Sequence, residues 1–457
     1  MTNLATYYPA VSEYYPVYDA AGPAIHWLGV IIGLLLAIGL ICWKMTPVAA
    51  MFTGTIVGVI IGGMMGDLTW SQLLPESLRV VIEGTRSLAG TFVRIIAGGV
   101  LAGVLIESGA AESIARGLVK KLGAKLALLA ITLSGTILTA SGIFMTVGVV
   151  ILAPIALSVG RRTNIHKMAL ILALSGGAKT GNLISPNPNA VALADSYGIP
   201  LSELMIAGFI PMIFGIVITT LLATAIKKKG SPVTAADGDA DSEANLPSFG
   251  KSIAAPAIAV GLLLSSTIGR AIGIGFFEAF ELDALFVLPI AALTGALILG
   301  KGRNFVEYTN KGIMKIAPIV LMLIGAGTIG ALITNSQLPG VFESAIIGLG
   351  LPTFMLAPLS GIFMASAIGS TAAGALLAGE MFAPTLIYAG INPVHGAVMT
   401  HAGSTTLDIM PHGNYFLASK DGLRVQLKER LSVWPYEAII GFTQVIVATI
   451  LFGFILG

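Results

Sequence analysis

The sequence predicts an all-α, polytopic membrane protein made of two inverted repeats with re-entrant hairpins and broken helices. Three observations lead to this prediction: the composition, two interrupted apolar stretches and an internal repeat. Of the 457 residues, 55% are hydrophobic and only 11% are charged, whereas a soluble domain carries about 25% charged residues. Many apolar segments are close to the ~20 residues that a spanning helix needs, which favours helices over a β-barrel.

The apolar segments are separated by short loops and by one hydrophilic linker. This linker, 227–251, divides the chain into a first transmembrane half, 26–226, and a second, 252–457. Residues 1–25 form an N-terminal segment with two Tyr-Tyr-Pro motifs, which we interpret as an interfacial aromatic segment. The apolar segments cover 26–43, 47–66, 88–106, 126–160, 168–194, 204–226, 252–272, 284–300, 316–334, 351–389, 394–416 and 433–456.

Basic residues orient these segments, because the cytoplasmic loops of membrane proteins are enriched in Lys and Arg. Loops such as 107–125 and 227–229 contain several basic residues, whereas 195–203 and 335–350 contain none. One alternation accommodates these loops, with both chain termini outside and the linker in the cytoplasm. The loop 67–87 carries both signs of charge and fits this alternation least well.

The two halves repeat each other at an offset of 226 residues. The tripeptide Leu-Ser-Gly ends at Gly135 and again at Gly361, and the interrupted stretches 175–195 and 401–414 keep the same offset. The basic loop 107–125 has no basic counterpart in the second half, so the halves should have opposite orientations in the membrane. Inverted repeats with helices broken at mid-membrane are typical of secondary transporters.

Two longer apolar stretches, 126–160 and 351–389, each begin and end on the same side of the membrane by the charge rule. The first is about 35 residues long, which is short for two spans of ~20 residues each. Small polar residues at 139–142 and 366–371 interrupt them. We interpret both stretches as re-entrant hairpins, which gives about 10 crossings plus 2 hairpins. Ordinary spans in both stretches are the alternative, with about 12–14 spans in total.

The interrupted stretches 175–195 and 401–414 are expected to form the two walls of one transport site. Pro186 and Pro188 cannot both lie within a continuous helix without a loss of backbone hydrogen bonds. Non-helical backbone at membrane depth is tolerated only where it is buried in protein or lines a polar cavity. The free amides of half-helix N-termini can hold a carboxylate there. We therefore expect a small organic anion as the partner of this site.

Polar side chains at the hairpin tips and in the broken stretches are the candidates for binding a hydroxylated anion. Lys179 can neutralise the substrate carboxylate, or pair with Asp408 when no substrate is bound. For each Ser and Thr, a hydrogen bond to its own helix backbone is the alternative; for Lys179, the alternative is snorkelling toward the membrane surface. The substrate-binding candidates are Thr139, Ser141, Gly142, Lys179, Asn182, Ser185, Asn187, Asn189, Ser370, Thr371, Ser404, Thr405 and Asn414.

Asp408 is the candidate for proton coupling, assisted by His401 or His412. An intramembrane carboxylate is costly unless it is paired or functional, and a histidine titrates near neutral pH. One alternative is an Asp–His clasp that holds the broken segment together. Another is a metal site, which no further carboxylate or thiolate nearby supports, so we expect no metal.

Composition and motifs argue against several other classes of protein. The single cysteine, Cys42, allows no intramolecular disulfide and no thiolate metal site. The His-Glu-x-x-His and Gly-x-Ser-x-Gly motifs of enzymes are absent, so we expect neither an enzyme nor a cofactor. The net charge of +2 reflects basic residues in short loops and predicts no nucleic-acid partner. A channel would need a pore lined by rings of charged side chains or backbone carbonyls, and the sequence shows no such repeated pattern. A sodium-coupled carboxylate carrier remains the main alternative, with Ser141, Asn182 and Ser370 as oxygen ligands.

Several short motifs are spread over most of the chain. They are Gly-Met-Met-Gly-Asp-Leu at 63–68, Glu-Ser-Gly-Ala-Ala-Glu-Ser-Ile at 107–114, Ala-Pro-Ile-Ala-Leu-Ser at 153–158 with Arg-Arg-Thr-Asn at 161–164, Ile-Ser-Pro-Asn-Pro-Asn-Ala at 184–190, Gly-Ala-Gly at 325–327 and Ile-Gly-Ser-Thr at 368–371. In these motifs the chain resembles the gluconate permease family, within the ion transporter superfamily. This resemblance implies proton-coupled uptake, across the inner membrane, of gluconate, related sugar acids or small hydroxy acids such as D-serine. The superfamily resemblance implies a homodimer that works by an elevator motion.

Two features depart from the pattern of that family. Where the family has a first Pro-His pair, this chain has Pro186 followed by Asn187. The second broken stretch, at 406–412, is more similar to that of hydroxybutyrate-type permeases. A short hydroxymonocarboxylate is therefore as good a candidate substrate as gluconate.

Overall fold

The computed structural model describes residues 25–43, 45–234, 237, 246–272, 282–348, 350–411 and 413–457. Within these residues the chain is helical, and its β-type pairing is one isolated bridge between Ile25 and Ser336. The prediction of an all-α fold is therefore confirmed. Most of the Tyr-rich N-terminal segment, and His412, lie outside the described residues.

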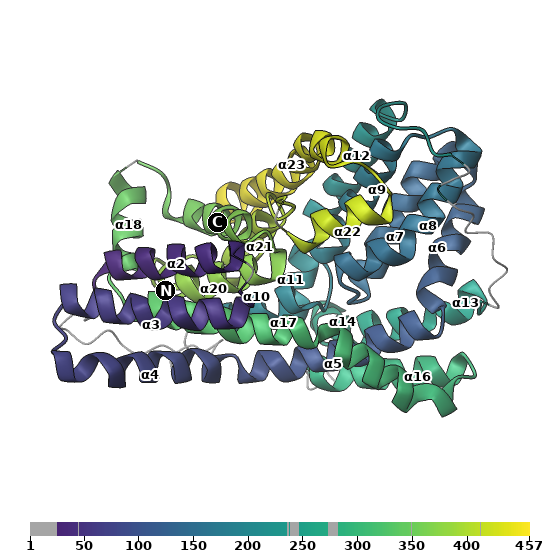
Figure 1. Ribbon diagram of the computed structural model, residues 1–457. Coiled ribbons are helices and arrows are strands. Elements are labelled where there is room, and N and C mark those ends of the chain that lie inside the picture. The colour runs from purple at the N-terminus through teal and green to yellow at the C-terminus, as the bar shows by residue number, and fades with distance from the viewer. Residues whose placement is uncertain are drawn as a thin grey trace.

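Long helices form a lower layer of the molecule (Figure 1). Helices α4 and α5 run end to end along its lower edge, and α17 packs along both of them. Helix α14 packs against α16, where the backbone of Gly295 approaches Ala255. The helices of this layer are α2 (Trp27–Cys42), α3 (Pro47–Met65), α4 (Trp70–Ser87), α5 (Ala89–Glu107), α14 (Ala254–Ile272), α16 (Ala284–Ile298) and α17 (Phe305–Thr334).

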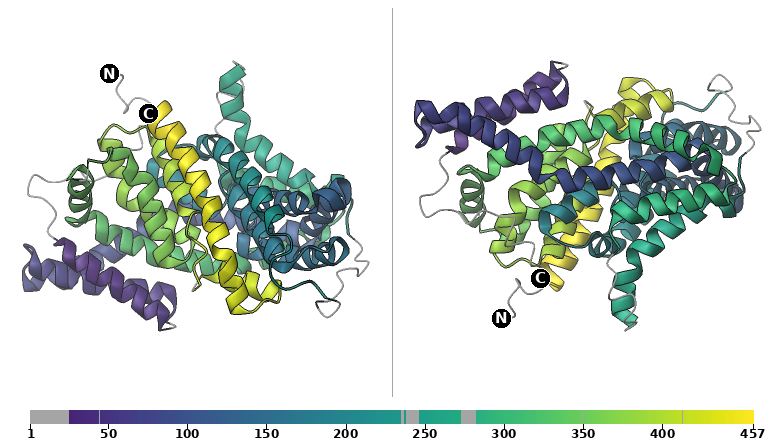
Figure 2. Two further views of the ribbon diagram at one scale, coloured as in Figure 1. Left: turned by 90° about the horizontal axis from the view of Figure 1, so that it is seen from above. Right: turned by 90° about the horizontal axis from the view of Figure 1, so that it is seen from below.

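A second group of helices packs on this layer, one series from each half of the chain. In Figure 2, α23 runs between the blue and teal helices of the first half and the green helices of the second. The first series is α6 (Ala110–Leu122), α7 (Ala127–Ala140), α8 (Met145–Thr163), α9 (Lys167–Asn182), α10 (Pro188–Tyr197), α11 (Leu201–Ala207), α12 (Phe209–Ala225) and the short α13 (Phe249–Ser252). The second is α18 (Leu338–Gly348), α19 (Leu356–Ile368), α20 (Thr371–Tyr388), α21 (Pro393–Ser404), α22 (Asn414–Gly422) and α23 (Leu427–Thr449), which continues as the π-helix Ile450–Ile455.

Helix starts in the two series fall 226 residues apart. Helices α8 and α20 begin at 145 and 371, α9 and α21 at 167 and 393, and α10 and α22 at 188 and 414. Residues with positive φ follow the same spacing: Asn164 and Gly198 in the first series, Gly390 and Arg424 in the second. The offset read from short sequence matches thus recurs in the positions of whole helices and of the turns between them.

Glycines let the first helix of each hairpin cross the following broken helix at close range. A Cβ atom added to Gly177 of α9 would lie 2.3 Å from the carbonyl oxygen of Thr132 on α7. A Cβ added to Gly403 of α21 would lie 2.3 Å from the carbonyl oxygen of Pro358 on α19. Small residues at such crossings allow backbones in a membrane to approach closely. Both broken helices are therefore tied to their hairpins by backbone contact.

The hairpin helices α7 and α19 are too short to cross a membrane alone. They have 14 and 13 residues, or about 20 Å at 1.5 Å per residue, against a hydrocarbon core of ~30 Å. Among the described residues, five helices are long and apolar enough to cross, or up to seven if each of two bent pairs is one span. Because length and composition alone give this count, the number of crossings remains a prediction.

The stretch 67–87, which we expected to be a loop, is mostly helical. Thr69 and Gln72 form a capping box that starts α4, and Arg79 forms ion pairs with Glu76 and Glu83 one turn away on either side. Such pairs at helical spacing stabilise an exposed helix. The charged residues that reduced the apolar character of this stretch therefore support an amphipathic helix.

The described part of the linker is tied to the start of α9. Lys167 Nζ lies 2.6 Å from Asp237 Oδ1, and the amide of Thr234 donates to the other oxygen at 2.7 Å. Burial alone would raise the pKa of Asp237, but the hydrogen bonds from Lys167 and Thr234 outweigh burial and hold that pKa below its usual value. At neutral pH this charged contact fastens the linker to the broken helix.

We expect Gly177→Ala to destabilise the protein by about 1–3 kcal/mol, the usual cost of overpacking. The added methyl group would collide with the backbone of α7. Gly148→Ala on α8 is the matched control, because no atom lies within 4 Å of its added Cβ and alanine favours a helix over glycine. Thermal unfolding in detergent should separate the two variants. Equal melting temperatures for both would contradict the close crossing.

Candidate functional site

Each hairpin tip meets the break in the broken helix of its own half. In the first half, Ser185 Oγ donates to the carbonyl oxygen of Thr139 at 2.5 Å, and a Cβ on Gly142 would lie 3.9 Å from Pro186. In the second half, a Cβ on Gly413 would lie 2.4 Å from the carbonyl oxygen of Gly369. The chain breaks predicted from proline and glycine thus lie beside the hairpin tips.

A buried ion pair joins the two halves at these breaks. Lys179, in the last turn of α9, donates to Asp408 and to the carbonyl oxygen of Thr405, both in the second broken stretch. The side chains of Lys179 and Asp408 are 0% and 1% exposed. Lys179 therefore does not snorkel to the surface. Its pairing with Asp408 is the arrangement that we expected in the absence of substrate.

Asp408 also connects the second hairpin to this pair. Thr371, the first residue of α20, donates to Asp408 Oδ2 at 2.5 Å. The same hydroxyl lies 3.9 Å from the sulfur of Met145, the first residue of α8. The start of α20, the end of α9 and the second break thus meet at the carboxylate of Asp408, and the start of α8 contacts the Thr371 hydroxyl beside it. This is the place where the free amides of α8 and α20 can act on an anion.

The first break presents buried amide side chains. Asn187 caps α10 by accepting from the amide of Ala190 at 3.1 Å, and its Nδ2 donates to Asn182. Asn182, Asn187 and Asn189 are each at most 4% exposed. The local sequence explains this order, since asparagine is a strong helix N-cap and proline suits the first helical turn that follows it. The candidates of the first break therefore lie together inside the protein.

The other candidate side chains bond to their own helices or face outward. Ser370 accepts from the amide of Ala373 at 3.5 Å and so caps α20. Asn414 begins α22, and its side chain is exposed. The remaining hydroxyls follow the alternative given above, a bond to a backbone carbonyl three or four residues earlier. They are those of Thr139, Ser141, Ser404 and Thr405.

His401 is buried in α21, and neither ring nitrogen has a hydrogen-bond partner among the described residues. The hydrogen bonds of Asp408 come from Lys179 and Thr371 instead. An Asp408–His401 clasp is therefore not what holds the second break in the described part of the chain. Nor do three or more His, Cys, Asp or Glu side chains gather there as a metal site.

A second buried network, which sequence reasoning missed, links α23 to α9 and α22 next to the site. Arg430 and Glu437, both on α23, form a bidentate ion pair at 2.8 and 2.9 Å and are at most 1% exposed. Glu437 accepts from Ser175 of α9 at 2.5 Å, and Ser175 accepts from Tyr415 of α22 at 3.1 Å. The available signal was a basic residue shortly before the last apolar segment, 433–456, and an acidic residue two helical turns later within it.

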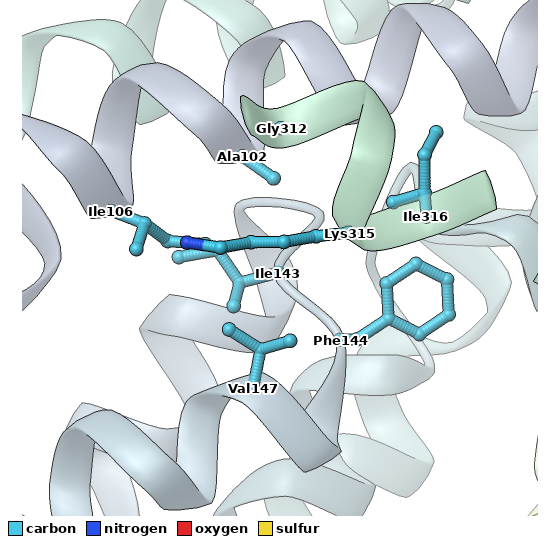
Figure 3. Close-up of a pocket in the computed structure, with 8 residues that line it drawn as sticks. All are labelled: Ala102, Ile106, Ile143, Phe144, Val147, Gly312, Lys315 and Ile316. Carbon is cyan, nitrogen blue, oxygen red and sulfur yellow. The ribbon is translucent and has the colours of Figure 1, made fainter. Parts of the chain in front are cut away.

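The first hairpin tip packs against the lower layer around a small apolar pocket (Figure 3). The stem of Lys315 crosses this pocket, and its ammonium pairs with Glu107 at 2.6 Å. The free volume is about 10 Å³, roughly the space for one water molecule. The lining residues are Ala102 and Ile106 of α5, Ile143, Phe144 and Val147 of the hairpin, and Gly312, Lys315 and Ile316 of α17. This place therefore has no room for an organic anion in the present conformation.

Comparisons with known proteins agree with this architecture. Residues 24–455 match the permeases described as the GntP family. An uncharacterized transporter of Haemophilus influenzae is 41% identical over 426 residues, covering 93% of this chain and 98% of the relative. The high-affinity gluconate transporter of Escherichia coli is 25% identical, with 90% and 94% of the two chains covered. The D-serine transporter DsdX of Escherichia coli is 23% identical, with 93% and 97% covered.

A solved structure shares the fold. The YdaH transporter of Alcanivorax borkumensis matches with a TM-score of 0.61 at 18% identity, covering 85% of this chain and 90% of that chain. At this level of identity, the similarity concerns the fold alone. The fold prediction is thus confirmed at the level of an all-helical fold with several apolar helices.

We expect Lys179→Met to destabilise the protein by about 3–5 kcal/mol, because it leaves a buried carboxylate without its cation. The double variant Lys179→Met/Asp408→Asn should recover most of that loss, since it removes both charges. A double-mutant cycle by thermal unfolding at constant pH measures this coupling. Additive losses in the double variant would contradict a direct ion pair.

Proposed function

The chain belongs to the GntP permease family, and from this premise we propose that it takes up a small hydroxylated carboxylate together with a proton. Membership itself makes the protein a multi-pass membrane transporter and not an enzyme. The proposal adds the substrate class, the coupling ion and the mechanism of alternating access. It also places the protein in the inner membrane, as its bacterial relatives suggest.

The names of the relatives support the substrate class. Gluconate and D-serine, the compounds named for two of them, are both small carboxylates with hydroxyl groups. The relative with 41% identity carries no substrate in its name. We therefore propose a sugar acid or a short hydroxy acid without choosing between them.

The Lys179–Asp408 ion pair is the single observation that carries the mechanism. Both charges are buried, and an unpaired charge is costly inside a membrane protein. An anion that arrived alone at Lys179 would leave Asp408 charged and without a cation. A proton that arrived alone at Asp408 would leave Lys179 without an anion. Binding both together leaves no unpaired charge, so the pair favours joint uptake of anion and proton.

The polar groups around the pair suit the rest of a hydroxy acid. Asn182, Ser185, Asn187 and Asn189 of the first break offer amide and hydroxyl groups to substrate hydroxyls. Thr371 would exchange its bond to Asp408 for one to the substrate. The other predicted substrate-binding residues remain proposals: Thr139, Ser141, Gly142, Ser370, Ser404, Thr405 and Asn414. His401 and His412 stay proposals as proton relays to Asp408. The alternative is coupling to sodium, bound by oxygen atoms at the hairpin tips. The uptake experiment below distinguishes sodium coupling from proton coupling.

The proposed mechanism is alternating access by two inverted repeats, 26–226 and 252–457, joined by the cytoplasmic linker 227–251. The recurrence of helix starts at an offset of 226 residues supports this division. The short α7 and α19 support re-entrant hairpins, whereas α8, the second arm of the first hairpin, is long and apolar enough to cross. Within this proposal we keep the predicted 10 crossings plus 2 hairpins. In this proposal the hairpins and broken helices move against the lower layer, and a homodimer holds that layer in the membrane.

We expect Asp408→Asn to lose uptake driven by a proton gradient while keeping exchange of labelled for unlabelled substrate. Asparagine cannot take up a proton, yet it leaves Lys179 free to bind the anion. Proteoliposomes under a proton gradient, and then under a sodium gradient, measure the difference. Asp421→Asn, at an exposed position of α22, is the matched control. Full proton-driven accumulation by Asp408→Asn, or wild-type uptake driven by sodium alone, would refute the proton role.

We also expect a hydroxy acid that binds the site to raise the melting temperature of the purified protein. At about 100 times its dissociation constant, a ligand stabilises by about 2.7 kcal/mol. Gluconate, glycerate, 3-hydroxybutyrate and D-serine form the first screen, with glucose as an uncharged control. The shift should disappear in Lys179→Met. A shift that survives in this variant would remove Lys179 from the site.

A further inference from the structure

We propose that Glu380 binds a proton and forms a second proton site of the transporter, where the second hairpin meets the lower layer. This carboxyl lies within α20, one arm of that hairpin, and was not among the residues singled out from the sequence. Its role in transport rests on the proposed function, but its protonation does not. The inference follows from its hydrogen bonds, the charges around it and the helix that it faces.

Within the described part of the chain, Glu380 forms one hydrogen-bond contact, with Ser196 of α10. Ser196 Oγ lies 2.9 Å from Glu380 Oε1 and 3.0 Å from the carbonyl oxygen of Ala192. A serine hydroxyl has a single proton to donate, while an ionised carboxylate and a carbonyl can only accept. If Ser196 donates to Ala192, as helical serines commonly do, the contact with Glu380 needs a proton on Glu380. A protonated Glu380 therefore satisfies both contacts at once.

The charges near Glu380 offer it no cation. Asp195, next to Ser196 on α10, accepts from Thr91 at 2.5 Å and pairs with Arg94 of α5 at 2.7 Å. Arg94 also pairs with Asp283 at 2.8 Å, so its positive charge is shared between two carboxylates. Among the described residues, no basic side chain pairs with Glu380. The charge that acts on Glu380 from α10 is thus the carboxylate of Asp195, which disfavours a second negative charge beside it.

The other helices around α20 do not supply a counter-charge either. Helix α19 contains no ionisable residue. On α21, the ring nitrogens of His401 have no hydrogen-bond partner, and His395 packs against Phe452. On α17, the basic Lys315 pairs with Glu107. Glu380 is partly buried, and a carboxyl that is withdrawn from water without a cation is cheaper to hold in its neutral form.

Glu380 faces the seam along which the proposed motion occurs. A Cβ added to Gly330 of α17 would lie 3.1 Å from Glu380 Cβ, so the side chain begins directly against the lower layer. An ionised Glu380 would place a negative charge without a cation beside Ser196, next to this seam. The present position of the hairpin on α17 is therefore more stable with the proton bound. Gain or loss of this proton then decides which positions of the hairpin are accessible.

Infrared spectroscopy of the purified protein tests the protonation without any substrate. The C=O band of a neutral carboxylic acid should be present at neutral pH and should be lost in Glu380→Gln. Glu112→Gln, whose carboxylate pairs with Arg116 at 2.8 Å, is the matched control and should leave that band unchanged. A spectrum in which Glu380→Gln removes no such band would overturn the inference. Glu380→Asp, which keeps a carboxyl, should retain a shifted band.

Transport then tests the role of this proton. Glutamine mimics the neutral carboxyl permanently, so Glu380→Gln should keep substrate exchange in proteoliposomes and lose accumulation driven by a proton gradient. Unchanged proton-driven accumulation in Glu380→Gln would overturn the coupling role. If the wild-type protein shows no proton-driven accumulation, the proposed function is refuted. The infrared spectra decide independently whether Glu380 is protonated.

Discussion

The buried ion pair between Lys179 and Asp408 is the interaction on which the proposed mechanism depends. Its two members come from the broken helices of different halves. The carboxylate of Asp408 also accepts a hydrogen bond from Thr371, at the tip of the second hairpin. A buried charge needs a partner of opposite sign. An anion that binds Lys179 therefore requires that Asp408 be neutralised at the same time. This requirement turns a structural contact into a coupling between an anion and a proton.

The surrounding fold keeps that contact in place. Close crossings at Gly177 and Gly403 hold each broken helix against its hairpin by backbone contact. The Arg430–Glu437 pair reaches Ser175 of α9 and thereby links the last helix to the first broken helix. Polar networks buried in this way are expensive unless every member is satisfied. They give the site a rigid frame, so that side chains near Asp408 can change partners without a loss of the helix packing.

Much of this arrangement could be predicted from the sequence, for physical reasons. Prolines and glycines marked the breaks, and the pairing of Lys179 with Asp408 followed from charges in two facing breaks. Helix α4 was missed because its ion-paired surface lowered its apolar character. Glu380 and Glu437 lie outside the predicted breaks. Their serine partners, Ser196 and Ser175, are distant in the chain. Which hydroxyls bind their own backbone also depends on rotamers that no spacing of residues determines.

The central claim is that anion binding and proton binding occur together at this pair. Calorimetric titration of a hydroxy acid into the purified protein, in buffers of different ionisation enthalpy, counts the protons taken up on binding. The account predicts uptake of a proton with each bound anion near neutral pH, and none in Asp408→Asn. Anion binding by the wild-type protein without any proton uptake would contradict it.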